Sequence, residues 1–228
     1  VKYILSLEED TSKSDVFYFT DHKRLSGVYW ALTSLELLGS LNLLSRQAIL
    51  DYVMSCYHPE VMLREDGSML STVSADVQPR SHETKKFAAF GGNADQDPHL
   101  LYTLSGIQVL ALYNALNLID CDAIVAYVAA LQQEDGSFAG DEWGEVDSRF
   151  SYCALLTLAI LGRMDAVNLQ TAADYVMSCV NFDGGFGCIP GAESHAGQIF
   201  CCVGALKLCN AHDQIDDEEE NDDCCWGV

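Results

Sequence analysis

The sequence predicts an all-α fold built from helical hairpins that repeat about every 48 residues. Two helical patterns lead to this prediction, because self-similarity at a fixed period is the signature of stacked repeat units. The first pattern carries anchor tyrosines at spacings of 49, 75 and 48 residues: Tyr3, Tyr52, Tyr127 and Tyr175. The second pattern is more apolar, and an acidic residue opens each copy: Asp21, Asp97, Asp147 and Glu193.

The first helix of each hairpin is expected to be the outer one, because it is amphipathic with a polar side. Its four copies are "KYILSLEED" (2–10), "DYVMSCYHP" (51–59), "AYVAALQQEDGSF" (126–138) and "DYVMSCVNFDGGF" (174–186). The glycine of "DGSF" or "DGGF" is expected to supply the positive φ that stops this helix.

The second helix is apolar nearly all round, which predicts an inner, buried position. The acidic residue that opens it is expected to cap the free N–H groups of its first turn. Its longest apolar run, residues 150–162, is shorter than the roughly 20 residues of a membrane span, so no span is expected. Hairpins of this kind stack into an open solenoid or curve into a closed α/α barrel.

The second unit carries about 27 surplus residues, which we assign to a polar stretch at 60–89 without helical periodicity. This stretch is expected to be an inserted, disordered loop. The predicted organisation is a repeat domain at 1–208 followed by an acidic, divergent tail at 209–228.

A formal net charge of −22 argues against nucleic acid or an anionic membrane as the main partner, and favours a basic protein partner. The ten cysteines lie mostly in apolar stretches, where free thiols behave as small hydrophobic groups. No secretory signal is visible at the start of the sequence. A reducing, cytoplasmic location is therefore expected.

The cysteines do not form the two short-spaced pairs that make a zinc site convincing. Cys188 with His195, or Cys201 with Cys202, are candidate ligands, but core packing is the favoured role. The acidic run at 216–222 imitates an aspartate-rich magnesium motif, yet it lies in a low-complexity tail and is read as a solvated segment.

Four segments resemble the β subunits of protein prenyltransferases: "LSGVYWALTSLELLG" (25–39), "DPHLLYTLSGIQVLAL" (97–112), residues 134–165, and "NFDGGFGCIPGAESHAGQIFCCVGAL" (181–206). Within that family they most resemble the type-2 geranylgeranyl transferase β subunit of the Rab-modifying enzyme. The resemblance covers most of 1–208 outside the insert. It implies an α/α toroid with an apolar lipid cavity, a diphosphate pocket at its mouth and a catalytic zinc that activates the acceptor thiolate.

The resemblance also implies partners: a prenyltransferase α subunit, a Rab GTPase presented by a Rab escort protein, and geranylgeranyl diphosphate as donor. It assigns His195 and Gly197 to the lipid diphosphate. The position of His195 agrees, because its ring and the first free N–H groups of an inner helix can face one anion. The alternative is a histidine that only caps the helix.

By resemblance, Ser26, Tyr29, Trp30, Tyr102 and Leu104 line the isoprenoid tunnel. A small residue at Ser26 is what lengthens the tunnel for a twenty-carbon chain in this family. Plain core packing is the alternative for this apolar and aromatic stripe.

Arg149 is a lone cation in an apolar inner helix, where a buried charge needs a partner. Two roles stay open from the sequence: contact with the acceptor peptide or lipid head, and a structural salt bridge to Asp147.

The family's zinc ligands are an Asp and a Cys two residues apart and a His in a later repeat, and no motif here matches them. The repeat pattern stops after Leu208, so the barrel is expected to be incomplete at its C-terminus. The chain alone is expected neither to hold zinc nor to catalyse. Three functions stay open. The first two are a protein geranylgeranyltransferase β subunit and a non-catalytic helical-repeat protein that binds lipid or a partner. The third is a terpene or squalene cyclase on a similar α/α barrel, which needs an aspartate-rich acid motif on an inner helix that is not seen here.

Overall fold

The computed structural model describes residues 1–2, 20–61 and 86–211. The predicted first helix at 2–10, the middle of the insert and most of the acidic tail therefore lie outside the described residues. The described α-helices are α3 (Arg24–Leu37), α4 (Arg46–Ser55), α5 (Leu100–Leu112), α6 (Cys121–Ala130), α7 (Ser148–Leu161), α8 (Leu169–Ser178) and α9 (Ala196–Leu208). Short 3₁₀ turns are η1 (Asp21–Lys23), η2 (Leu41–Leu43), η3 (Leu116–Leu118) and η4 (Met164–Ala166).

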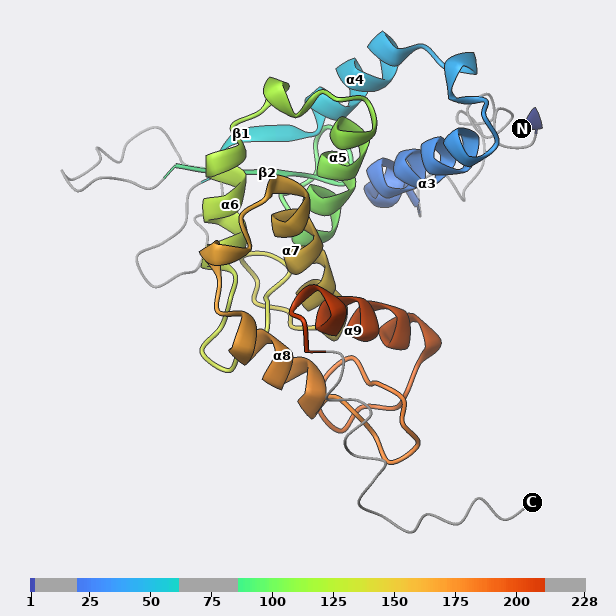
Figure 1. Ribbon diagram of the computed structural model, residues 1–228. Helices are drawn as coiled ribbons and strands as arrows, with labels where there is room; N and C mark the ends of the chain where they lie inside the picture. Colours follow the sequence, from blue (N-terminus) through green and yellow to red (C-terminus); the bar gives the residue numbers. More distant parts are fainter. Residues whose placement is uncertain (3–19, 62–85, 212–228) are drawn as a thin grey trace, which may run out of the picture.

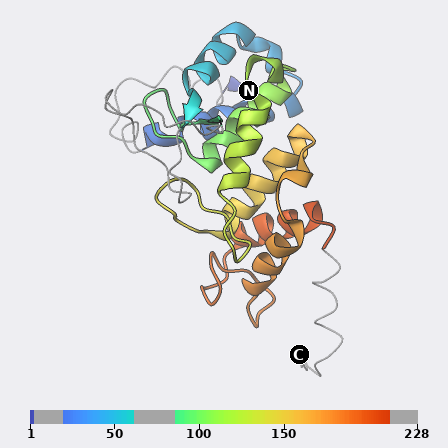
Figure 2. The same ribbon diagram turned by 90° about the vertical axis from the view of Figure 1, so that its left-hand side faces the viewer.

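The helices form two layers. Helices α3, α5, α7 and α9 make an inner row in which each contacts the next, and α4, α6 and α8 each contact the inner helix that follows them. Figure 1 shows the inner row as an arc, with α6 and α8 on its outer side, and Figure 2 shows the stack turned by 90°. The predicted succession of outer and inner helices is confirmed.

Burial along the inner row is uneven. Helices α5 and α7 each bury eight residues, whereas α3 and α9 bury four each. The prediction that every inner helix is buried nearly all round is therefore wrong for α3 and α9. The reason is their place in the row: within the described residues they have an inner neighbour on one side only.

Helix α7 joins two hydrophobic cores. Its Phe150, Ala154 and Leu158 belong to the core formed with α3 to α6, and its Leu155 belongs to the core formed with α8 and α9. The predicted apolar run at 150–162 is thus the helix shared by both cores. No helix in the described part of the chain is long and apolar enough to cross a bilayer.

The ends of the predicted insert are not loop. Strand β1 (Tyr57–Val61) pairs antiparallel with β2 (Phe87–Phe90), so Tyr57 lies opposite Phe90. The prediction of a loop at 60–89 is wrong at both ends. All four residues of β2 are buried, because the strand packs against α5 and α6. A fully buried strand lacks the polar alternation by which a sequence reveals strands.

Glycines turn the chain after the outer helices, but they do not end them. Gly136 and Gly184 have φ of 89° and 73°, as predicted. Helices α6 and α8 nevertheless end at Ala130 and Ser178, several residues earlier. At Gly136 a Cβ would also collide with the backbone carbonyl of Thr171, so this turn packs against α8 too closely for any side chain.

The contact between α5 and β2 can be tested at Gly106. A Cβ there would lie 2.7 Å from the Phe90 ring, so we expect Gly106→Ala to cost about 1–3 kcal/mol of unfolding free energy. Gly27 on α3 has no atom within 4 Å of such a Cβ, so Gly27→Ala should stabilise by about 0.5–1 kcal/mol. Urea unfolding followed by circular dichroism measures both. Equal effects of the two substitutions would contradict the packing described for β2.

Candidate functional site

The N-termini of the inner helices lie at one side of the row, because each is tied to the turn of the following repeat. The first backbone N–H of α5, from Leu100, donates to the carbonyl of Gly140 at 2.8 Å. The Ser148 N–H of α7 donates to the carbonyl of Cys188 at 2.7 Å, and Leu25 of α3 makes the equivalent bond. The positive ends of the inner helices therefore gather where the predicted diphosphate residues lie.

The caps of these helices are His99, Asp147 and His195, which are spaced by 48 residues. Each side chain accepts a hydrogen bond from the backbone N–H two residues further on. Among the predicted caps, Asp147 is therefore confirmed. The predicted caps Asp97 and Glu193 are wrong by two residues.

The fourth predicted cap, Asp21, is also wrong. It begins η1, and α3 follows Lys23 without a side-chain cap. Before α5 and α7 the chain stays extended as far as Pro98 and Val146, which make bridges to Gly91 and Ala139. Helix α5 therefore begins later than Asp97 suggested, whereas α7 begins directly after Asp147.

His195 is exposed and caps α9. Its Nδ1 accepts the Gly197 N–H at 3.0 Å, so the proton of the neutral ring belongs on Nε2. The Nε2–H is then a free donor on the positive end of a helix. The structure shows His195 in the capping role, which was the alternative. Its Nε2–H stays available for the predicted diphosphate role. The Gly197 N–H donates to the His195 ring, so Gly197 is part of the cap of α9.

Arg149 makes the salt bridge that the sequence left open. Its Nε and Nη2 donate to the two carboxylate oxygens of Asp147 at 2.9 and 2.7 Å. Hydrogen bonding to this carboxylate raises the pKa of Arg149. Asp147 is buried, whereas 47% of the Arg149 side chain is exposed. The guanidinium is thus held by Asp147 along one edge, lies with its Cζ 5.9 Å from the centre of the Phe150 ring, and is partly open to solvent.

Gln198 joins the two helix ends. Its Nε2 donates to Oδ1 of Asp147 at 3.4 Å, and the same oxygen accepts the Arg149 backbone N–H at 2.8 Å. Gln198 lies in the first turn of α9, close after His195. His195 and Arg149 are consequently held at neighbouring helix N-termini, where both donors and both helix dipoles favour an anion.

His99 occupies the same repeat position as His195 but differs in its surroundings. Its ring contacts those of Phe150 and Tyr102, with centroids 5.2 and 5.6 Å away. Burial lowers the pKa of His99, although the nearby carboxylates of Asp141 and Glu145 oppose this. A neutral, enclosed ring suits a structural cap. Sequence reasoning missed His99, and the 48-residue spacing from Asp147 was the available signal.

The predicted tunnel residues separate into two groups. Ser26 is only 4% exposed and its hydroxyl lies 2.9 Å from that of Ser105, at the contact between α3 and α5. Leu104 is also buried, so both contribute to packing between helices. Tyr29 and Tyr102 are half-buried, and Trp30 is 65% exposed.

An aromatic face crosses the inner row. Tyr152 of α7 and Phe200 of α9 meet edge to face with centroids 5.6 Å apart. Burial raises the pKa of Tyr152, and the nearby Cys201 and Tyr29 raise it further. Tyr29 lies on α3, at the other side of α5 in the inner row, and is half-buried. We call Tyr29, Tyr152 and Phe200 the aromatic face. Tyr152 and Phe200 were missed, although they lie 48 residues apart.

The described residues do not fit a zinc site. No three His, Cys, Asp or Glu side chains gather within the ranges 1–2, 20–61 and 86–211. Cys202 is buried while the adjacent Cys201 is partly exposed. Burial raises the pKa of Cys202 to about 12, which keeps the thiol protonated and a poor metal ligand.

The family profile described as "Prenyltransferase alpha-alpha toroid domain" matches residues 1–225. The chain belongs to the prenyltransferase β-subunit family. This prenyltransferase chain is 38% identical over 230 residues to the geranylgeranyl transferase type-2 subunit beta of Saccharomyces cerevisiae. It is 44% identical over 216 residues to the type-2 subunit beta 1 of Arabidopsis thaliana.

These alignments cover 99% and 95% of the prenyltransferase chain, but 62% and 59% of the two relatives. Among solved structures, the protein geranylgeranyltransferase-I of Candida albicans complexed with GGPP matches with a TM-score of 0.71 at 18% identity. That match covers 96% of this chain and 61% of the other. It supports the predicted α/α toroid fold.

The cap assignment can be tested by comparing two aspartates. Asp147→Ala removes a helix cap and the partner of Arg149, so we expect a loss of about 2 kcal/mol or more. Asp97→Ala at the exposed position two residues before His99 should change stability by less than about 0.5 kcal/mol. Thermal and urea unfolding of both variants measure this. A larger loss for Asp97→Ala would restore the acidic residue as the cap.

Proposed function

We propose that this chain is the repeat region of the β subunit of a type-2 protein geranylgeranyltransferase. It would transfer the geranylgeranyl group from geranylgeranyl diphosphate to C-terminal cysteines of Rab-type GTPases. Sequence identities of 38% and 44% to two type-2 β subunits support this choice. The chain spans about three fifths of their length, so activity, substrates and partners belong to the proposal.

The observation that carries the proposal is the pair of donors at neighbouring helix ends. His195 offers its Nε2–H and Arg149 the open face of its guanidinium, while Gln198 and Asp147 hold α9 and α7 together. In a chain of net charge −22, an anionic diphosphate needs such a local group of donors. Gly197 permits the arrangement, since a Cβ there would lie 3.1 Å from Nδ1 of His195.

The isoprenoid chain is proposed to lie on the aromatic face of Tyr29, Tyr152 and Phe200. An apolar chain gains roughly 0.8 kcal/mol for each CH₂ that it buries, so an open aromatic surface suits a lipid better than water. Trp30 and Tyr102 also keep exposed ring surface. A role for Ser26 and Leu104 in lining the isoprenoid tunnel stays a prediction. Both residues are buried, so they would act from beneath the surface.

In the proposed reaction, the acceptor cysteine gives its thiol proton to solvent, and its thiolate sulfur forms a bond to C1 of the isoprenoid while the C–O bond to diphosphate breaks. The diphosphate leaves with the bonding electron pair, and the donors of His195 and Arg149 stabilise that charge. Zinc, which the family resemblance implies for thiolate activation, has no fitting set among the described residues, so no step is assigned to it. The proposed partners are an α subunit and a Rab GTPase with its escort protein, and the free cysteines suit the cytoplasm.

The donor role of His195 can be separated from its capping role. Asparagine is a good helix cap, so His195→Asn should keep stability but lose the Nε2–H. We expect it to weaken geranylgeranyl diphosphate binding by about 1.5–3 kcal/mol, the range for a hydrogen bond to a charged group. His195→Ala should lose binding and also about 1 kcal/mol of stability. Titration with a fluorescent lipid diphosphate and thermal unfolding provide the two readouts. Unchanged affinity of His195→Asn would limit His195 to capping.

The lipid surface can be tested with two exposed phenylalanines. Phe200 is 68% exposed on α9, and Phe182 is fully exposed in a turn. Phe200→Ala should weaken geranylgeranyl diphosphate binding by about 1–2 kcal/mol through lost apolar contact, while Phe182→Ala should not. Equal effects would place the lipid elsewhere. Lipid binding without transfer, in the presence of an α subunit, an escort protein and a Rab, would favour the non-catalytic alternative.

A further inference from the structure

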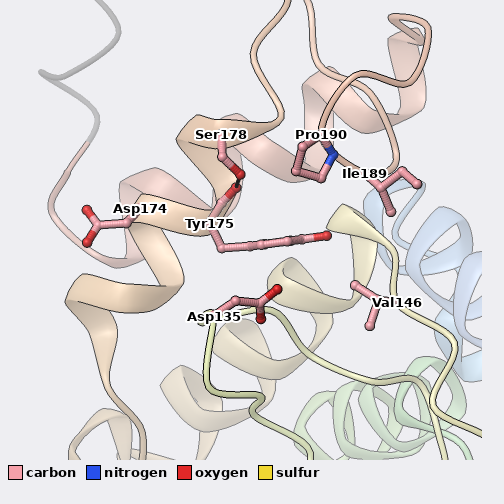
Figure 3. A pocket seen from close by; sticks show the side chains of 7 residues that line it. All are labelled: Asp135, Val146, Asp174, Tyr175, Ser178, Ile189 and Pro190. Carbon is pink, nitrogen blue, oxygen red and sulfur yellow. Dashed lines mark hydrogen bonds between the residues drawn. The ribbon is translucent and has the colours of Figure 1, made fainter.

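A second candidate site lies beside the outer helix α8, where Val146 and Ile189 adjoin the first turn of α7. It is a cavity of about 390 Å³ between α8 and two loops. Figure 3 shows the Tyr175 side chain crossing it, with Asp135 on one side and Pro190 on the other. Val146 and Ile189 form the apolar end and Asp174 lies at the opposite end.

Two carboxylates give the cavity its charge, and no basic side chain lines it. Oδ1 of Asp135 accepts the N–H and the hydroxyl of Ser137, at 3.0 and 2.6 Å, which fixes the carboxylate in its turn. Oδ1 of Asp174 accepts from Gln170 at 2.8 Å. Both residues are exposed, so their second oxygens can reach a ligand.

Tyr175 supplies an independent observation. Its side chain is 5% exposed, and its hydroxyl has no hydrogen-bond partner among the described residues. Figure 3 shows this hydroxyl directed toward the end of the cavity formed by Val146 and Ile189. Burial raises the pKa of Tyr175, and the nearby Cys179 thiol and Asp135 carboxylate raise it further. A neutral, buried hydroxyl without a partner is costly, and a ligand would remove that cost.

Comparison with the other repeats shows what the Tyr175 hydroxyl lacks. In the first described repeat, the Tyr52 hydroxyl donates to Oδ1 of Asn93 at 3.0 Å. In the next repeat, Asp141 occupies the position of Asn93, but the buried Tyr127 hydroxyl has no hydrogen-bond partner among the described residues. In the third repeat this position is Ile189, which cannot accept a hydrogen bond.

The same comparison explains why the cavity is open and acidic. The residues 48 positions before Asp135 and Asp174 are Phe87 and Ala126. Phe87 is buried in strand β2 and Ala126 packs against the same core, so that repeat is filled with apolar side chains. Asp135 and Asp174 replace both of these apolar residues, although the position of Asp174 is also acidic in the first described repeat, at Asp51. The cavity is therefore open and charged relative to the preceding repeat.

We propose that this cavity binds an alkylammonium group, such as that of a lysine side chain or a polyamine. The ammonium would lie between the Asp135 carboxylate and Tyr175, which offers its ring face and a hydroxyl oxygen as acceptor. The methylene stem would pack on Val146, Ile189 and Pro190. The net charge of −22 would draw cationic ligands toward this surface.

The test is a titration with n-butylammonium, followed by the methyl NMR signals of Val146 and Ile189. We expect saturable shifts with n-butylammonium and none with n-butanol, which has the same stem without the charge. Asp135→Asn keeps the Oδ1 acceptor of the turn, and Tyr175→Phe removes only the hydroxyl. Each should weaken binding about tenfold, the size expected for loss of one charge-assisted contact.

Matched controls come from the neighbouring repeats. Tyr127→Phe and Asp97→Asn should leave the n-butylammonium affinity unchanged, and all variants should keep the thermal unfolding midpoint within a few degrees. A peptide with a single lysine and the diamine putrescine then distinguish the two sources of the ammonium. The proposal fails if n-butanol binds equally, if Asp135→Asn and Tyr175→Phe bind as tightly as the parent chain, or if the shifts lie elsewhere.

Discussion

One hydrogen bond between successive repeats organises the described structure. The first backbone N–H of an inner helix has no partner within its own helix, and the turn before the next inner helix supplies one. This occurs at Leu100 with Gly140 and at Ser148 with Cys188, and the second N–H of α3, from Leu25, makes the equivalent bond to Gly92. Because each repeat completes the helix end of the preceding one, the turns cannot vary in length. The 48-residue period of the sequence reflects this constraint.

The fixed turn gives each of its ten positions a constant place, so different residues there face the same surroundings in different repeats. The last position is His99, Asp147 or His195, and all three cap a helix. Neighbours then decide the chemistry: aromatic rings enclose His99, Arg149 neutralises Asp147, and His195 stays exposed. At the fourth position, Asn93 accepts a hydrogen bond from the Tyr52 hydroxyl, whereas Ile189 cannot accept one from Tyr175.

Helix α7 has a central role because it contributes to both hydrophobic cores. Its first turn carries Asp147 and Arg149, and its side toward α9 carries Tyr152. Arg149 and Tyr152 are therefore held by packing from both directions, and Gln198 ties the first turn of α9, next to His195, to Asp147 at the same helix end. Part of the proposed diphosphate and lipid contacts thus belongs to the helix that both cores constrain, as is required of a binding site that must be preformed. The acidic cavity lies on the outer layer, where one repeat departs from the pattern of the others.

The sequence by itself determined the all-α repeat, the succession of outer and inner helices and the family, because apolar periodicity and repeat spacing are local properties. It could not place the helix starts to within two residues, nor find β1 and β2, because those depend on backbone pairing between distant segments. The tertiary structure alone decided which equivalent residues became sites. His195 and Tyr175 have the same residue types as His99 and Tyr127 in an earlier repeat. Only the side chains brought against them leave the His195 ring exposed and place Tyr175 on an open cavity.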